Sequence, residues 1–250
     1  TAIGRIDLDQ LADACDDRTR VVSASWVGFA NGCRRDVRAI ADIAHQHDAL
    51  FFLDAIQGLG VFPLDVVAAN VDCLAADGHK WLLGPEGAGI VYIRRECLGR
   101  LQPIGVGWNS VVNALDFSHI ELKLKPTAQR YEGGTLNMAG FLALGASLEL
   151  LSSLGIENIA NTILDFTEQA GEMLAELGAT LHSPRDRVEE CSGIICFELP
   201  NQNPFEVRKH CLEQGVVLAC RGGRLRLSAH AYNNEDDLNR TLEALRSFKG

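Results

Sequence analysis

The sequence has no run of basic residues and no long apolar segment. Its 250 residues carry 23 Lys and Arg against 33 Asp and Glu, a formal net charge of −10. A protein that binds a nucleic-acid backbone needs the opposite balance, so we expect no nucleic acid among its partners. The longest apolar runs, at 49–53 and 89–93, are far shorter than the ~20 residues that cross a bilayer. No membrane-spanning segment is predicted.

The eight cysteines include no CxxC pair. In a chain of this length, that scatter argues against both a disulfide framework and a zinc site, so we predict no metal centre. The same argument predicts a reducing, cytoplasmic compartment. The first residues show no signal-peptide pattern. Because the sequence starts at Thr1, we expect it to begin inside a longer chain.

What the sequence does have is the balance of a globular chain, 47% hydrophobic and 22% charged. This is enough apolar material for a large core. In the first part, apolar strand-like segments alternate with helical ones, which predicts a mostly parallel sheet covered on both faces. The expected strands lie at 21–25, 50–53, 72–76 and 89–94, with helices over 36–46 and 64–70.

The pattern changes after a long apolar helix expected over 139–154. A second helix is predicted next, followed by a strand, a helix, a pair of strands and a terminal helix, which is typical of a small α+β domain. These elements are expected at 156–177, 193–199, 204–214, 216–220, 224–228 and after Asn234. We therefore predict a large domain over 1–151 and a small C-terminal domain over 152–250.

Two residues with reactive side chains lie at the ends of neighbouring predicted strands. Asp54 stands at the carboxyl end of one strand and Lys80 lies just beyond the end of the next, where open α/β sheets place their ligands. One interpretation is a salt bridge or a solvated loop. The other is a lysine that forms a Schiff base, paired with an acid that holds the pyridinium nitrogen of a cofactor. Spacing alone leaves both open.

Four motifs in order favour the second interpretation. They are the run from Asp54 through Gln57 to His79 and Lys80, the Gly-Pro-Glu-Gly after it, RYEGGTLN at 130–137, and RLRLSAHAYNNEDDLNRTLEAL at 224–245. Together they resemble the class V aminotransferase family of pyridoxal 5'-phosphate (PLP) enzymes, which includes cysteine desulfurases, kynureninase and members similar to isopenicillin N epimerase. The resemblance covers essentially the whole chain.

The resemblance also implies an architecture, the fold-type I arrangement of PLP-dependent transferases. This is an α/β fold with a mostly parallel sheet in a large PLP-binding domain and a small α+β C-terminal domain. Members of the family begin well upstream of the position matched by Thr1. The large domain is therefore expected to be incomplete at its N-terminus.

Four residues receive cofactor roles from the resemblance. Lys80 becomes the catalytic lysine, which forms the internal aldimine with PLP and later moves the α-proton of the substrate. Asp54 faces the pyridine nitrogen and keeps it protonated, so that the ring acts as an electron sink. Gln57 matches the residue that bonds the phenolic oxygen of the ring. His79 matches the histidine that lies against the cofactor, with a histidine that only caps the strand end as the alternative.

Phosphate and substrate roles fall on two later residues. Thr135 resembles part of a loop that reaches across a dimer to the phosphate of the neighbouring subunit, which implies a homodimer with shared active sites. Arg226 matches the arginine that grips the substrate carboxylate, a task suited to a planar fork of donors. Asn137 is equally explained as the N-cap of the helix that follows.

The chain departs from the family pattern at two positions. Asp77 stands where the family usually has a Ser or Thr hydroxyl on the phosphate, and a carboxylate there would repel the phosphate unless it were protonated or turned away. Phe29, in WVGFANG, stands where desulfurases have an asparagine near the cofactor. The second departure favours the epimerase-like or generic aminotransferase branch.

The function implied by the resemblance is a PLP-dependent enzyme of the class V aminotransferase type, acting on an amino acid through an external aldimine and a carbanion. One alternative is Cβ cleavage of the cysteine desulfurase or selenocysteine lyase type. The other is a non-enzymatic scaffold that keeps the fold. Joint retention of Asp54, Gln57 and Lys80 argues against the scaffold, which has no physical need for all three.

Cys220 bears on the desulfurase alternative. Desulfurases carry a nucleophilic thiol on a mobile loop shortly before the substrate arginine, whereas residues 221–225 alone separate Cys220 from Arg226. Five extended residues reach only ~17 Å, and the Gly222-Gly223 pair predicts a tight hairpin that uses this reach to reverse direction. We therefore predict that the chain is not an efficient cysteine desulfurase.

Overall fold

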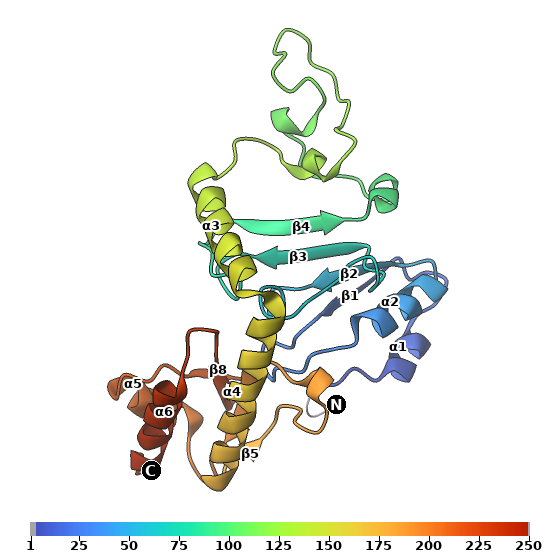
Figure 1. Ribbon diagram of the computed structural model, residues 1–250. Coiled ribbons are helices and arrows are strands. Elements are labelled where there is room, and N and C mark those ends of the chain that lie inside the picture. The colour runs from blue at the N-terminus through green and yellow to red at the C-terminus, as the bar shows by residue number, and fades with distance from the viewer. Residues whose placement is uncertain (1–3, 250) are drawn as a thin grey trace.

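The computed structural model describes residues 4–249, which form two four-stranded sheets (Figure 1). The first sheet has the order β1-β2-β3-β4. Its first three strands are parallel and β4 is antiparallel to β3 at the edge: β1 (Val21–Ser25), β2 (Leu50–Asp54), β3 (Cys73–Asp77) and β4 (Gly89–Ile93). The second sheet is antiparallel, in the order β5 (Thr180–Leu181), β6 (Ile194–Glu198), β8 (Arg224–Ser228) and β7 (Ala219–Arg221).

The helices begin at polar caps that the sequence supplies. The side chains of Asp36 and Asn137 accept hydrogen bonds from the backbone N–H groups of Ala39 and Gly140, so the prediction of Asn137 as an N-cap is confirmed. The α-helices are α1 (Leu8–Ala14), α2 (Val37–Gln46), α3 (Met138–Leu154), α4 (Ile156–Glu176), α5 (Pro204–Glu213) and α6 (Glu235–Ser247), and short 3₁₀ helices span Arg95–Gly99, Trp108–Ser110, Ala128–Tyr131 and Val188–Glu190.

The predicted helix over 64–70 is wrong, because this segment forms turns. The Asp65 carboxylate accepts hydrogen bonds from the N–H groups of Val67 and Ala68, as in the first turn of a helix. Asn70 then adopts a left-handed φ of 58°, which ends the turn before a second one forms.

The first sheet has helices on one face only. Phe51, Leu53 and Leu74 point to that face and are buried in a core that includes residues of α2 and α3, which lie on the same side of the sheet (Figure 1). The opposite face carries no α-helix in residues 4–249, and Val91 there is 48% exposed. The prediction of a sheet covered on both faces is therefore wrong for the described residues.

Helices α3 and α4 connect the two sheets. Gly155, with a φ of 81°, separates them. Ile159 and Ile163 in the first half of α4 belong to the core of the first sheet, whereas Ala170 and Leu174 belong to the core of the second. The expected domain boundary after residue 151 falls in the last turn of α3 and stays a prediction, since α4 contributes to both cores.

No single helix in the described part of the chain is long and apolar enough to cross a membrane. The pair α3 and α4 meets the length and composition criteria only when taken together, across a bend of 78°.

Candidate functional site

Asp54 is held in one orientation at the end of β2. Because β1 and β2 pair in register, Ser25 lies beside Asp54 and its hydroxyl donates a hydrogen bond of 2.8 Å to Asp54 Oδ2. The N–H of Ile56 donates to Oδ1 over 3.2 Å. Arg35 donates to the carbonyl oxygen of Ser25 over 2.7 Å. The carboxylate thus faces the helix-free side of the sheet in a fixed orientation.

A cavity of about 390 Å³ lies in front of this carboxylate. Asp54, Asp77 and Glu132 contribute carboxylates to its lining, together with apolar residues of β3 and β4. The cavity therefore presents negative charge at the strand ends. A cationic ring nitrogen is the kind of partner that such a charge stabilises.

Lys80 lies in a tightly closed loop after β3. The N–H of Gly78 donates to the carbonyl oxygen of Ala88, and the N–H of Gly84 donates to that of Gly78, both over 2.8 Å. A Cβ on Gly78 would lie 2.5 Å from the Ala88 oxygen, so only glycine fits there. Lys80 makes no side-chain hydrogen bond or ion pair within residues 4–249. Lys80 as a whole is half-buried, and its amine has no competing partner among these residues.

Gln57 is buried, with 8% of its surface exposed. Its side-chain oxygen Oε1 accepts a hydrogen bond of 2.8 Å from the indole Nε1 of Trp81, the residue after Lys80. Because the oxygen of the Gln57 amide is bound to Trp81, the two N–H groups of the amide nitrogen point away from Trp81. Gln57 can therefore donate a hydrogen bond, and a phenolate oxygen needs such a donor.

Asp77 and His79 form a pair beside the lysine. Asp77 Oδ2 lies 3.1 Å from His79 Nδ1, and Asp77 Oδ1 accepts a hydrogen bond of 2.8 Å from the N–H of Gly78. The His79 imidazole and the Gly78 N–H lower the pKa of the Asp77 carboxyl, against the effect of burial. Asp77 is therefore ionised and engaged with its neighbours, and it does not supply a phosphate ligand.

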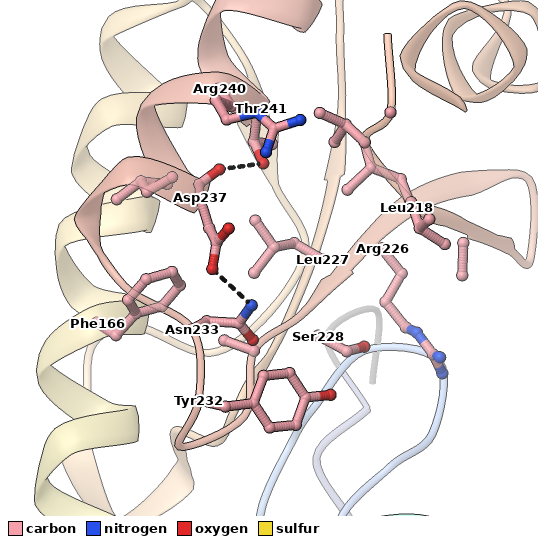
Figure 2. Close-up of a pocket in the computed structure, with 16 residues that line it drawn as sticks. Phe166, Leu218, Arg226, Leu227, Ser228, Tyr232, Asn233, Asp237, Arg240 and Thr241 are labelled. Carbon is pink, nitrogen blue, oxygen red and sulfur yellow. Dashed lines mark hydrogen bonds between the residues drawn. The ribbon is translucent and has the colours of Figure 1, made fainter. Parts of the chain in front are cut away.

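Arg226 reaches from the second sheet to the loop after β1. Its Nη1 donates a hydrogen bond of 2.6 Å to the carbonyl oxygen of Phe29. Figure 2 shows the guanidinium pointing away from Leu227 and Asp237, which line a cavity of about 470 Å³ in the second half of the chain. Burial and the charge of Arg221 lower the pKa of Arg226, and its Nε is buried without a partner in residues 4–249. The Nε–H donor of the Arg226 guanidinium is thus not used within these residues.

Thr135 lies apart from these residues. It is exposed, in the loop that precedes α3. Its hydroxyl makes no hydrogen bond within the described part of the chain. The structure brings Asp54 and Asp77 to one cavity and joins Gln57 to the residue beside Lys80, but it does not bring Thr135 to them. The roles of Thr135 and the other site residues stay predictions.

Sequence reasoning missed the residues that orient the site. Ser25 is the last residue of β1 and Asp54 is the last residue of β2. Because the two strands are parallel neighbours, this shared position could have indicated that the two side chains meet. Arg35 and His230 gave no such signal. His230 contacts Trp81 across 149 residues of sequence.

Residues 1–241 match the model of the family described as Aminotransferase class-V. The chain belongs to this family. The class V resemblance of the sequence is thereby confirmed, and so are the fold-type I architecture and PLP as the cofactor of the family. Asp54, with its carboxylate at the strand-end cavity, fits the ring nitrogen of that cofactor, whereas Asp77, bound to His79, does not fit its phosphate. The contacts of Lys80 and Gln57 with the ring stay predictions.

Relatives of this class V chain agree with the assignment. It is 33% identical to a protein of Methanothermobacter thermautotrophicus named "Probable cysteine desulfurase", over 99% of this chain and 65% of the relative. It is 27% identical to the "Uncharacterized aminotransferase YcbU" of Bacillus subtilis, over 97% of this chain and 63% of the relative. The chain thus spans slightly less than two thirds of the length of both relatives.

The fold of this class V chain also matches solved structures. The cystine C–S lyase C-DES, in complex with its reaction product cysteine persulfide, superimposes with a TM-score of 0.91 at 24% identity. This match covers 100% of the present chain and 68% of the other. At this level of identity, the likeness is one of fold.

Proposed function

We propose that the protein is a PLP-dependent enzyme that acts on a sulfur-containing amino acid and cleaves its Cβ–S bond. The observation that carries the proposal is the placement of Asp54 at the end of β2 and of Lys80 beyond the end of the adjacent β3, with Gln57 oriented by Trp81. The desulfurase name of the Methanothermobacter relative supports sulfur chemistry. When bound, PLP supplies a ring that withdraws electrons from the substrate Cα.

The chain's own residues have separate tasks in this proposal. Lys80 Nζ takes the proton from Cα, because this amine has no other partner in residues 4–249 that would hold it away from the substrate. Asp54 holds the positive charge of the ring nitrogen. Arg226 binds the substrate carboxylate through guanidinium N–H groups other than the one that donates to the Phe29 carbonyl oxygen. As the Cβ–S bond breaks, the electron pair leaves with the sulfur, so no oxidant or reductant is needed.

The position of Cys220 favours release of the sulfur without transfer to a thiol of this hairpin. Cys220 pairs with Leu225 in the β7–β8 hairpin, whose turn consists of Gly222 and Gly223 with φ angles of 58° and 76°. Both glycines are left-handed, as a two-residue hairpin requires. A thiol fixed in this ladder does not swing into the site. Cysteine would then yield sulfide, and cystine would yield cysteine persulfide.

Transamination is the second candidate, favoured by Phe29. This residue stands at the position of the desulfurase asparagine, is 60% exposed, and offers its carbonyl oxygen to Arg226. The family name and that of the Bacillus relative also fit this reaction. A comparison of sulfide release with keto-acid formation from the same amino acids separates the two candidates.

We also propose that the enzyme is a homodimer with shared active sites. The segment between β4 and α3 projects from the body of the chain (Figure 1). It exposes the large apolar side chains Ile104, Leu115, Phe117, Ile120 and Leu122. Thr135 follows on the same segment. A second copy with two-fold symmetry would cover this apolar surface and receive the Thr135 hydroxyl near its own site.

The Lys80→Ala variant tests the proposed function. The wild-type enzyme with PLP should show an absorbance band near the edge of the visible range, which comes from the bond between the lysine and PLP, and borohydride should reduce this bond. Lys80→Ala should keep its fold and lose this lysine-linked band. Lys209→Ala, a change of an exposed lysine on α5, is the matched control and should retain the band. An unchanged spectrum in Lys80→Ala would overturn the assignment.

A further inference from the structure

Trp81 and His230 form a contact that joins the Lys80 loop to the second half of the chain. The ring of His230 stacks on that of Trp81 with centroids 5.2 Å apart and an interplanar angle of 22°. The ring of Tyr232 also stacks on that of His230, with centroids 5.1 Å apart and an interplanar angle of 8°. Trp81 is 5% exposed and His230 is 8% exposed, so water is largely excluded from the contact.

The hydrogen bonds of His230 define its tautomer. Nδ1 accepts from the N–H of Ala231 over 2.8 Å, so it carries no proton. The proton is therefore on Nε2, which lies 3.0 Å from the carbonyl oxygen of Trp81 and donates to it. Burial lowers the pKa of His230, although this bond opposes the effect. A neutral imidazole thus satisfies the backbone carbonyl next to Lys80.

Both sides of Trp81 are confined by glycines. A Cβ on Gly193 would lie 2.6 Å from the Trp81 ring, and one on Gly60 would lie 2.6 Å from its carbonyl oxygen. Gly193 stands before β6 and Gly60 follows the Gln57 turn. The indole therefore has little freedom to rotate, and its N–H stays directed at Gln57 Oε1.

We infer that Trp81 and His230 are positioning residues, which fix Gln57 as a hydrogen-bond donor and hold the backbone beside Lys80. The inference rests on the proposed roles of Gln57 and Lys80 and assigns their control to residues outside the cofactor contacts. Without the indole N–H, the Gln57 amide is free to rotate by half a turn and present its oxygen. An oxygen facing a phenolate would repel it.

A double-mutant cycle tests the step through Gln57. Trp81→Phe keeps an aromatic ring against His230 but removes the indole N–H. In the full enzyme we expect PLP affinity to fall about 3- to 10-fold, the effect of one hydrogen bond, with a shift in the absorbance maximum of bound PLP. In a Gln57→Ala background, the same substitution should change affinity less than about twofold. Equal effects in both backgrounds would overturn the inference.

Two substitutions test the role of His230. His230→Phe keeps the stack and removes the hydrogen bond to Trp81, so it should reproduce the shifted absorbance maximum. His230→Gln offers an amide N–H to the same carbonyl and should restore the wild-type spectrum at least in part. His210→Phe is the matched control, because His210 also contacts an aromatic ring and a hydroxyl but in the α5–α6 region. An identical spectrum in all three variants would count against His230.

Failure of this inference is distinguishable from failure of the proposed function. The coupling between Trp81 and Gln57 can also be measured after removal of PLP, from the free energies of unfolding of the same four proteins. If Lys80→Ala keeps the lysine-linked band, the proposed function fails whatever this coupling is. If Lys80→Ala loses the band but the coupling is absent, the positioning inference alone fails.

Discussion

At the residue scale, Asp77 shows how neighbouring groups accommodate an unexpected charge. It lines the same cavity as Asp54, and two carboxylates near a phosphate would repel both it and each other. His79 and the Gly78 N–H bind the Asp77 carboxylate on its two oxygens and lower its pKa. His79 therefore has a partner on the protein, in addition to the cofactor contact that its motif predicts.

Replacement of Asp54 by Ala separates chemistry from binding. The substitution removes a charge-assisted contact worth roughly 1.5 to 3 kcal/mol, and it also removes the reason for the ring nitrogen to stay protonated. Turnover should therefore fall more than PLP affinity does. Steady-state kinetics and a PLP titration measure the two effects. Equal losses in both would contradict the electron-sink role, and Ser25→Ala, which leaves the carboxylate in place, is the milder control.

His230 should make the enzyme sensitive to acid. Burial lowers its pKa in the folded state below the ordinary value of 6.5. As the pH falls below this value, the unfolded chain binds a proton that the folded chain does not, so stability decreases in that range. Melting temperatures measured between pH 7 and 5 should fall for the wild type and be flatter for His230→Gln. Parallel curves for the two proteins would contradict this account.

At the scale of elements, the β7–β8 hairpin decides what Cys220 can do. The strands pair from Ala219 to Arg226, and the turn uses only Gly222 and Gly223. In a short hairpin with a two-residue turn, the backbone hydrogen bonds hold each residue in place. The Cys220 side chain therefore cannot move by several ångströms. This is the structural reason for our prediction that the chain is not an efficient desulfurase that uses Cys220.

The prediction on Cys220 is tested by sulfide release from cysteine under reducing conditions. Cys220→Ala should release sulfide at about the wild-type rate, because the thiol lies in the ladder and takes no part. Cys196→Ala, on the paired side of the same sheet, controls for packing effects. Fast release that disappears only in Cys220→Ala would make a thiol-transfer desulfurase the leading function.

At the scale of the whole molecule, one face of the first sheet and the projecting segment before α3 are the surfaces that the described residues leave open. Asp54 faces the first, and apolar side chains such as Phe117 and Ile120 crowd the second. Several large apolar side chains exposed on one segment are typical of an interaction surface. The candidate site at Asp54 therefore lies on a face of the sheet that no helix of the described residues covers.

The homodimer is tested by sedimentation of the full enzyme. If the apolar segment is the interface, Phe117→Asp with Ile120→Asp should shift the enzyme towards monomer and lower its PLP occupancy, because each site would lose the Thr135 hydroxyl of the other subunit. Leu212→Asp, an exposed apolar position on α5, should leave both unchanged. A monomeric wild type with full PLP occupancy would refute the shared site.

The sequence by itself missed the strand at Thr180–Leu181 and began the strand at Ala219–Arg221 three residues early, at 216. It determined the other strands, most helix bounds and the order of the chemical motifs. These features are local, because a buried strand needs an apolar run and a helix start needs a polar cap. For the same reason, the tight hairpin at Gly222-Gly223 was predictable and is confirmed. The prediction of a helix over 64–70 is wrong because the Asp65 carboxylate binds the N–H of Val67 in a single turn and the left-handed backbone of Asn70 ends that turn.

Only the tertiary structure decided how the site is oriented. Trp81 meets Gln57 across 24 residues and His230 across 149, and no local pattern records which distant ring will stack on an indole. The open face of the first sheet was likewise beyond the sequence, since apolar residues such as Val91, 48% exposed, lie on the uncovered face where the strand pattern predicts cover. Hydrogen-bond direction at Gln57 follows from these contacts, because an amide orients itself by the partner that binds its oxygen.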